Sequence, residues 1–218
     1  MKTNYNSIIS ILVMTIALGS CGKSTKGKMA NDWKVTSMTT ESTSTSADGS
    51  KYTSTQTMNE TRMDAKYVTT AADGSVTTVT DDARVNTNEF TIEKDGAWKW
   101  IQDLSYSTDS GEVRTRSEKS GVWSFIGKNK GDDFKKNERV LFNILKADYS
   151  TVHKNQGTIV NEYNANYEYL TGYETAIYTV KESKKDELQL EAESENMTNQ
   201  YSNESKITSK TSMTLKTK

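Results

Sequence analysis

The stretch WKWIQDLSYS, residues 98–107, alternates between large apolar and polar side chains. Its apolar positions are Trp98, Trp100, Leu104 and Tyr106, and its polar positions include Lys99, Asp103, Ser105 and Ser107. A period of two residues is typical of a β-strand, because successive side chains point to opposite faces of a sheet. The pattern therefore predicts an antiparallel strand that is packed on one face and wet on the other.

The same alternation returns in other segments of the chain. Its apolar positions are Phe90 and Ile92; Val140, Phe142 and Ile144; Tyr163, Ala165, Tyr167 and Tyr169; Leu188 and Leu190; and Ile207, Met213 and Leu215. No segment of helical length keeps the apolar period of about 3.6 residues that a helix requires. We therefore expect an all-β protein whose closely spaced antiparallel strands form a barrel or a sandwich. A closed barrel has no free strand edges, which protects it from aggregation.

The tetrapeptide Ala-Asp-Gly-Ser occurs twice, at residues 47–50 and 72–75. Asp-Gly between strand-like runs favours a two-residue type I′ turn, since both central positions of that turn need a positive φ. Such a turn in the second copy predicts the cross-strand pairs Val68 with Val79 and Lys66 with Asp81. The first copy lies in a hairpin, residues 36–61, that consists mostly of Ser and Thr. We expect this hairpin to be an arm projecting past the core or one wall of an open barrel.

The N-terminal segment has the features of an export signal. An apolar run at residues 8–18 follows a short start that contains Lys2, and small residues precede Cys21. This order is typical of a secretory signal peptide, and the run is shorter than the roughly 20 residues that span a bilayer. The sequence Leu-Gly-Ser-Cys at 18–21 resembles the bacterial lipobox, which implies that Cys21 is diacylated and becomes the first residue after cleavage. The alternative is a structural thiol in a leader that is simply removed.

The lipobox predicts a signal peptide at residues 1–20, a lipid-anchored polar tether at 21–28 and one barrel domain at 29–218. Acyl chains would hold the protein on a membrane, at roughly 0.8 kcal/mol for each buried CH₂ group. Because Cys21 is the only cysteine, the exported fold has no internal disulfide. The chain carries 28 Lys and Arg against 29 Asp and Glu, a balance that argues against a nucleic-acid partner. Its 4 Trp, 4 Phe and 11 Tyr favour a folded chain, although the hydrophobic fraction is only 33%.

The sequence offers no convincing catalytic or metal-binding constellation. His153 is the only histidine, and its polar surroundings predict a solvated loop residue rather than a general base. One histidine and a lipidated cysteine do not make a zinc site. The acidic pairs at 81–82 and 132–133 lack the spaced oxygen ligands of a calcium loop. We therefore predict a protein that is not an enzyme and has no catalytic residues, no metal and no cofactor.

Two motifs resemble those of the lipocalin-like lipoproteins of Bacteroidetes. They are NDWKVT at 31–36, and GVWSF at 121–125 followed by a polar glycine-containing loop. The resemblance implies a small β-barrel in which Trp33 of the first strand closes one end. The chain departs from the family where Asn31 occupies a position that is usually glycine. It also has no arginine after Arg139 to stack on the tryptophan, which leaves a lysine such as Lys210 for that role.

Together these observations predict an all-β, antiparallel, up-and-down, lipocalin-like barrel of about eight to ten strands with a long Ser/Thr-rich hairpin. The aromatic side chains either fill the barrel or line an apolar ligand pocket. The pocket candidates are Trp33, Trp98, Trp100, Tyr106, Trp123 and Phe125. The predicted function is that of a non-catalytic cell-envelope lipoprotein that binds a small apolar ligand, anchored at the periplasmic face of the outer membrane. The alternative is an envelope scaffold that contacts another envelope protein through the hairpin at 36–61.

Overall fold

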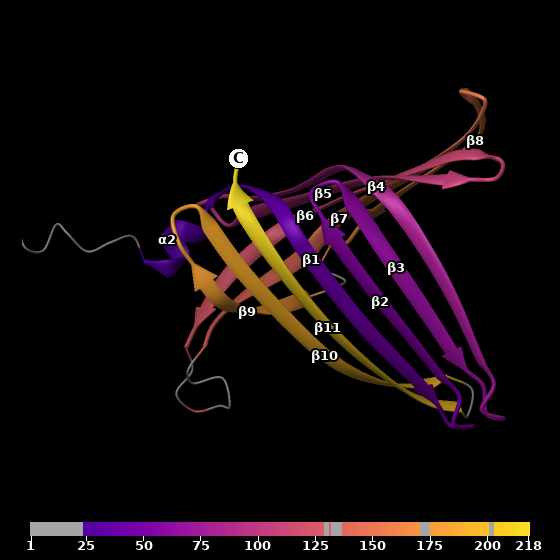
Figure 1. Cartoon of the computed structure of the whole chain (residues 1–218). Coiled ribbons are helices and arrows are strands. Elements are labelled where there is room, and N and C mark those ends of the chain that lie inside the picture. The colour runs from indigo at the N-terminus through magenta and orange to yellow at the C-terminus, as the bar shows by residue number, and fades with distance from the viewer. Residues whose placement is uncertain (1–23, 129–130, 132–136, 171–174, 201–202) are drawn as a thin grey trace, which may run out of the picture.

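The computed structural model describes residues 24–128, 131, 137–170, 175–200 and 203–218. Within these residues it contains one short helix and a sheet of 11 strands (Figure 1), so the all-β prediction is confirmed. The elements are α2 (Thr25–Met29), β1 (Asn31–Ser46), β2 (Lys51–Asn59), β3 (Arg62–Thr70), β4 (Val76–Ile92), β5 (Ala97–Thr108), β6 (Gly111–Gly127), β7 (Glu138–Asn155), β8 (Thr158–Glu168), β9 (Thr175–Ser183), β10 (Glu187–Gln200) and β11 (Asn203–Thr217).

The strands close into an antiparallel barrel of 10 strands, as the sequence predicts. Most strands pair with their neighbours in sequence, and β11 pairs with β1 to complete the ring. Strand β7 is shared, because its first residues pair with β9 and its later residues pair with β8. Among the described strands, β8 pairs only with β7 and therefore lies outside the ring.

The two ends of the barrel differ in girth. At the narrow end, next to α2, residues 31–34 of β1 pair directly with residues 89–92 of β4. Further along, β2 and β3 separate β1 from β4, and the strands diverge into two arms (Figure 1). We call the part built from β1 to β4 with β10 and β11 the hairpin arm. The part built from the distal halves of β5, β6 and β7 with β8 is the tyrosine arm.

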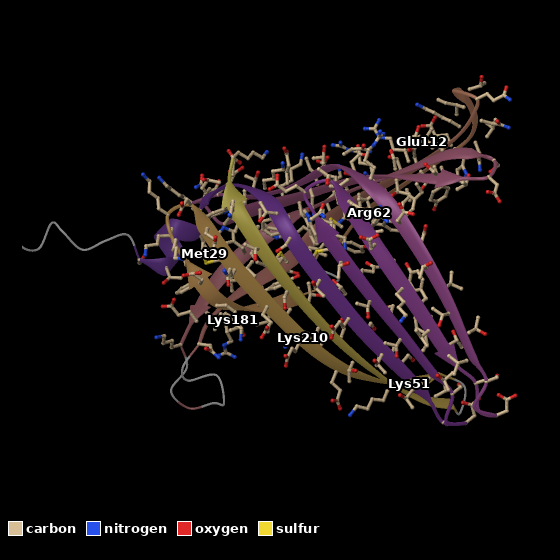
Figure 2. All side chains as sticks on the ribbon, in the orientation of Figure 1. Met29, Lys51, Arg62, Glu112, Lys181 and Lys210 are labelled. Carbon is tan, nitrogen blue, oxygen red and sulfur yellow. The ribbon has the colours of Figure 1, made fainter. Side chains whose placement is uncertain are left out.

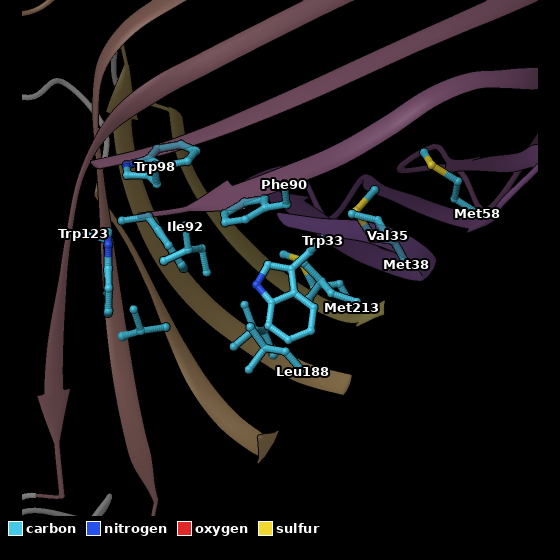
Figure 3. Packing of buried hydrophobic residues seen from close by; sticks show 14 of the residues in the cluster. Trp33, Val35, Met38, Met58, Phe90, Ile92, Trp98, Trp123, Leu188 and Met213 are labelled. Atoms are coloured by element: carbon cyan, nitrogen blue, oxygen red, sulfur yellow. The ribbon is translucent and has the colours of Figure 1, made fainter. Parts of the chain in front are cut away.

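The narrow end is filled by side chains from most strands of the ring. The buried residues Trp33, Phe90, Ile92, Trp98, Phe142, Leu188 and Leu215 form its centre. Figure 3 shows Trp33, Phe90, Ile92, Trp98 and Leu188 of this group. The Phe90 ring stacks on Trp98 at 5.5 Å and meets Phe142 edge-on at 5.1 Å. Buried indole groups need a hydrogen-bond acceptor, and the Trp33 N–H finds one in the carbonyl oxygen of Met29 at 2.8 Å.

Charged side chains lie almost entirely on the outer face of the barrel. Figure 2 labels several of them, including Lys51, Arg62, Glu112, Lys181 and Lys210. On β10 and β11 they form a ladder in which Lys210 pairs with Glu193 at 2.9 Å and Lys206 pairs with Glu195 at 2.9 Å. Exposed ion pairs of this kind each contribute about 0–1 kcal/mol, so their main effect is to keep the outer surface wet.

The hairpin turns differ from the predicted type I′ turn. In the second Ala-Asp-Gly-Ser copy, the Ala71 amide donates to the Ser75 carbonyl and the Gly74 amide donates to the Ala71 carbonyl, which makes a three-residue loop. Only Gly74 takes a positive φ, of 84°, as this loop type requires. The longer loop shifts the register by one residue, so the predicted pairs are wrong. The observed pairs are Val68 with Thr78, Tyr67 with Val79 and Lys66 with Thr80.

The Ser/Thr-rich hairpin at residues 36–61 is a wall of the barrel and not a projecting arm. Strand β1 pairs with β11 from Ser37 to Ser46, and β2 pairs with β3 along nearly its whole length. Both backbone edges of the hairpin are therefore hydrogen-bonded within the chain. This pairing on both sides sets a register that the weak side-chain pattern of the hairpin leaves open.

The predicted tether at 21–28 is only partly an extended linker. Residues 1–23, which include the predicted signal peptide and Cys21, lie outside the described residues. The segment Thr25–Met29 is the helix α2, and its last residue, Met29, is fully buried at the narrow end. The Lys26 ammonium lies 5.9 Å from the centre of the Trp123 ring, and the Lys28 ammonium donates to the Ser183 carbonyl at 3.4 Å. Because one apolar and two cationic side chains fix the helix, its residues belong to the barrel.

The expected substitution of Lys210 for a stacking arginine is also wrong. Lys210 lies on the outer face of β11 opposite Glu41, and its ammonium pairs with Glu191 and Glu193. Trp33 instead pairs with Thr217 at the other end of β11. The indole of Trp33 is covered by the core and by α2.

Two polar positions of the opening stretch, Asp103 and Ser105, are buried, contrary to the predicted wet face. The Asp103 side chain is only 1% exposed although it lies on the outer face of β5. The Arg114 guanidinium covers it and donates to it at 2.5 Å, and the Asn86 amide donates at 3.0 Å. These hydrogen bonds, that of Arg114 above all, hold the pKa of the Asp103 carboxyl below its usual value. Long arginine side chains from the next strand thus exclude water from a shorter acid.

Candidate binding surface at the wide end

The six predicted pocket residues all lie on the inner face, but they divide into two groups. Trp33, Trp98 and Trp123 are at most 5% exposed and belong to the packed core of the narrow end. Trp100, Tyr106 and Phe125 are only partly buried and pack against the edge of that core. The first group fills the barrel. Trp100 and Tyr106 border the space between the arms, whereas Phe125, opposite Val140, lies at the other end of β6.

A small polar group marks the boundary between the core and the wide end. The Trp100 indole N–H donates to the Asn88 side-chain oxygen at 2.8 Å. The Asn88 amide in turn donates to the Met58 sulfur at 2.9 Å. Asn88 is 3% exposed, so these contacts satisfy a buried amide. They also orient the Trp100 ring at the base of the tyrosine arm.

Tyrosines gather on the inner face of the tyrosine arm. The strand registers place Tyr149 opposite Ser117 and Ala165, and Tyr167 opposite Ala147, whose own side chain is buried in the core. The rings of Tyr149 and Tyr167 meet edge-on at 6.0 Å. Tyr167 and Tyr169 are stacked at 6.4 Å with an interplanar angle of 3°. Tyr163, two residues before Ala165, continues the same face toward the tip of β8.

The hairpin arm presents an almost uncharged inner face to the tyrosine arm, and Asp81 of β4 is its one charged side chain among the described residues. Tyr67 and Tyr52 stack there at 6.3 Å, and the Gln56 amide donates to the Tyr67 hydroxyl at 3.4 Å. The remaining inner positions of β1 and β11 in this arm are mostly Ser and Thr.

Tyr106 lies at the fork between the arms, next to the last pair of β4 with β5, Arg84 with Ser105. Burial, followed by the charge of Asp81, raises the pKa of its phenol.

The tyrosines of this surface are accessible to solvent. The exposed fractions are 38% for Tyr149, 59% for Tyr163, 45% for Tyr167 and 42% for Tyr52. A core tyrosine would be nearly covered, so these rings do not simply fill the barrel. Among the residues that the structure describes, each tyrosine of a strand lies on the inner face, whereas the charged side chains of the two arms are outside except for Asp81 and Lys119. The wide end is therefore an exposed aromatic surface inside a charged shell.

Sequence reasoning did not single out two contributors to this surface. Tyr149 has the opposite parity to the predicted core positions Val140, Phe142 and Ile144, and it faces inward because the pairing of β7 with β6 is irregular opposite Ser120 and Gly121. Lys119 faces inward because it shares the parity of Trp123. Counting back by twos from Trp123 reaches Lys119, so the signal was present in the sequence. His153 lies in β7 and not in a loop as predicted. It is on the inner face, opposite Val113 of β6.

The comparisons with known proteins leave the chain without a relative. No protein-family model, no curated protein and no solved structure matches it. The resemblance to the lipocalin-like lipoproteins of Bacteroidetes thus remains a prediction. In the described part of the chain, no helix has the length and apolar character needed to cross a bilayer. The same residues contain no group of three or more His, Cys, Asp or Glu side chains that could hold a metal ion.

Proposed function

We propose that the protein is a non-catalytic binding protein of the bacterial cell envelope, anchored by lipid at Cys21. It takes a small, mostly apolar molecule on the tyrosine-lined inner surface of the wide end. The observation that carries this proposal is the exposure of Tyr149, Tyr163 and Tyr167 on the inner face of a barrel whose charged side chains lie almost entirely outside. Tyrosine offers a rigid apolar ring with one polar tip, which suits a site that binds an apolar body and fixes its orientation.

A fluorescence titration tests the binding site. The full chain with Cys21 replaced by Ala is free of lipid, and the indole of Trp100 lies at the base of the tyrosine arm as the reporter. We expect 1-decanol to change the tryptophan emission, and the double change Tyr149→Ala with Tyr167→Ala to weaken its binding about tenfold, because each ring would bury apolar area against the ligand.

The matched control replaces Val122 and Ile177 with Ala. These two apolar side chains are similarly exposed, at 45% and 46%, but they lie on the outer face. The control should bind 1-decanol as the parent does. If both double variants bind equally well, the probe is held elsewhere and the proposed site is wrong.

Replacement of Cys21 by Ala tests the anchor. The parent protein should fractionate with membranes and require detergent for release, because acyl chains bury many CH₂ groups in the bilayer. The variant should instead be soluble or keep its leader, which mass spectrometry of the intact chain distinguishes. The change Ser24→Ala, outside the predicted lipobox, is the control. Mature variant protein that still needs detergent would contradict the lipid anchor.

A further inference from the structure

Lys119 is a charged residue on the otherwise uncharged inner face of the tyrosine arm. In the described residues of this arm it is the single formally charged side chain that faces inward, whereas its strand neighbours Glu118, Arg116 and Arg114 face outward. The strand registers place it in one row with Trp100 on β5, Ala147 on β7 and Tyr167 on β8. Side chains directly opposite each other in a sheet are about 5 Å apart at Cβ, so the lysine stem lies between the indole of Trp100 and the methyl group of Ala147, and the phenol of Tyr167 lies one strand further along the row.

The ammonium group of Lys119 has no counter-ion in the described part of the chain. The ion pairs of the structure include Lys99 with Glu118 and Lys146 with Asp148, both on the outer face of the same sheet, but none involves Lys119. Its side chain is half-buried. A lysine packs its apolar stem against neighbouring side chains and keeps its ammonium group in water. The ammonium of Lys119 is therefore available to a bound anion.

We infer that the ligand carries an acidic head group and that Lys119 is its counter-ion. This inference rests on the proposed function and names the class of ligand: an amphipathic molecule with a singly charged carboxylate on an apolar body. The head group would accept a charge-assisted hydrogen bond from the Lys119 ammonium, and the body would lie along Tyr149 and Tyr167. A single lysine supplies one positive charge and three donors, which matches one carboxylate.

The test compares three probes with the same ten-carbon chain: decanoate, 1-decanol and decyltrimethylammonium. They share an apolar chain and differ in the head group, which is negative, neutral and positive in turn, and tryptophan emission of the lipid-free full chain reports binding. We expect decanoate to bind about 10-fold more tightly than 1-decanol, as a hydrogen bond between charged groups provides. The cation should bind most weakly.

Substitution of Lys119 separates the charge from the apolar surface. Lys119→Met keeps most of the stem, so it should weaken decanoate about 10-fold and leave 1-decanol unchanged. Lys119→Arg should restore the preference for the acid. Lys99→Met removes a lysine from the outer face of the adjacent strand and should change neither affinity.

The outcomes distinguish this inference from the proposed function. If 1-decanol and decanoate bind equally to the parent, or if Lys119→Met keeps the preference for decanoate, the role of Lys119 is wrong while the binding surface stands. If none of the three probes binds the parent, the proposed function fails and the inference falls with it.

Discussion

Replacement of Trp33 by Ala should lower the free energy of unfolding by about 3–5 kcal/mol, the range for removing a large aromatic side chain from a packed core. Trp33 is fully buried, and it lies where β1 pairs directly with β4 and where α2 covers the narrow end. Its loss would leave a void at the point of ring closure. Urea denaturation followed by far-ultraviolet circular dichroism measures the change.

A second substitution at Trp33 separates the loss of the hydrogen bond from the loss of the aromatic ring. Trp33→Phe keeps an aromatic ring but leaves the buried carbonyl oxygen of Met29 without its donor, which costs about 1–3 kcal/mol. Its stability should therefore lie between those of the parent and Trp33→Ala. A Trp33→Ala protein within about 1 kcal/mol of the parent would show that the narrow end is not a packed core.

Replacement of Gly121 by Ala should be almost as damaging, at about 3 kcal/mol, near the upper end of overpacking costs. Gly121 lies on the inner face of β6 opposite Trp98, at an irregularity in the pairing with β7. A Cβ atom there would overlap the carbonyl oxygen of Asn143 and crowd the amide of Leu145. Both are backbone atoms of β7, so no side-chain rotation relieves the clash and the strands must separate. Thermal and urea unfolding both measure this loss.

Gly49→Ala is the control for this prediction. Gly49 lies at the tip of the first hairpin with a φ of 84°, and a Cβ atom there would have no neighbour within 4 Å. Its replacement should cost only about 1–2 kcal/mol, the penalty of the left-handed conformation. Equal losses at the two positions would mean that the close approach of β7 does not explain the glycine at 121.

The all-β architecture and the inward direction of the aromatic side chains were predictable from alternation alone. Trp98, Phe90 and Leu188 lie inside because each shares one parity with other apolar residues of its strand, and a strand has only two faces. The closure of the ring could be inferred less directly, since the pairing of β1 with β11 joins segments about 180 residues apart and rests on mixed Ser/Thr faces.

Registers and special environments were not predictable from the same pattern. An Asp-Gly pair fits both a two-residue and a three-residue loop, and the choice moves every later pair by one position, as Tyr67 opposite Val79 shows. The burial of Asp103 depends on arginine side chains from β6 that the local pattern of β5 does not contain. The accessible surface at Tyr149 and Tyr167 depends on how far the two arms diverge, which is a property of the whole sheet.

The direct contact between β1 and β4 makes β2 and β3 an excursion that the closure of the ring does not require. Residues could be added to or removed from β2 and β3 in matched pairs, and the tryptophan-filled end would keep its contacts. The packed narrow end could thus stay the same while the length of β2 and β3 at the wide end changes. Evolution or protein design could change the dimensions of the wide end by editing one stretch of chain.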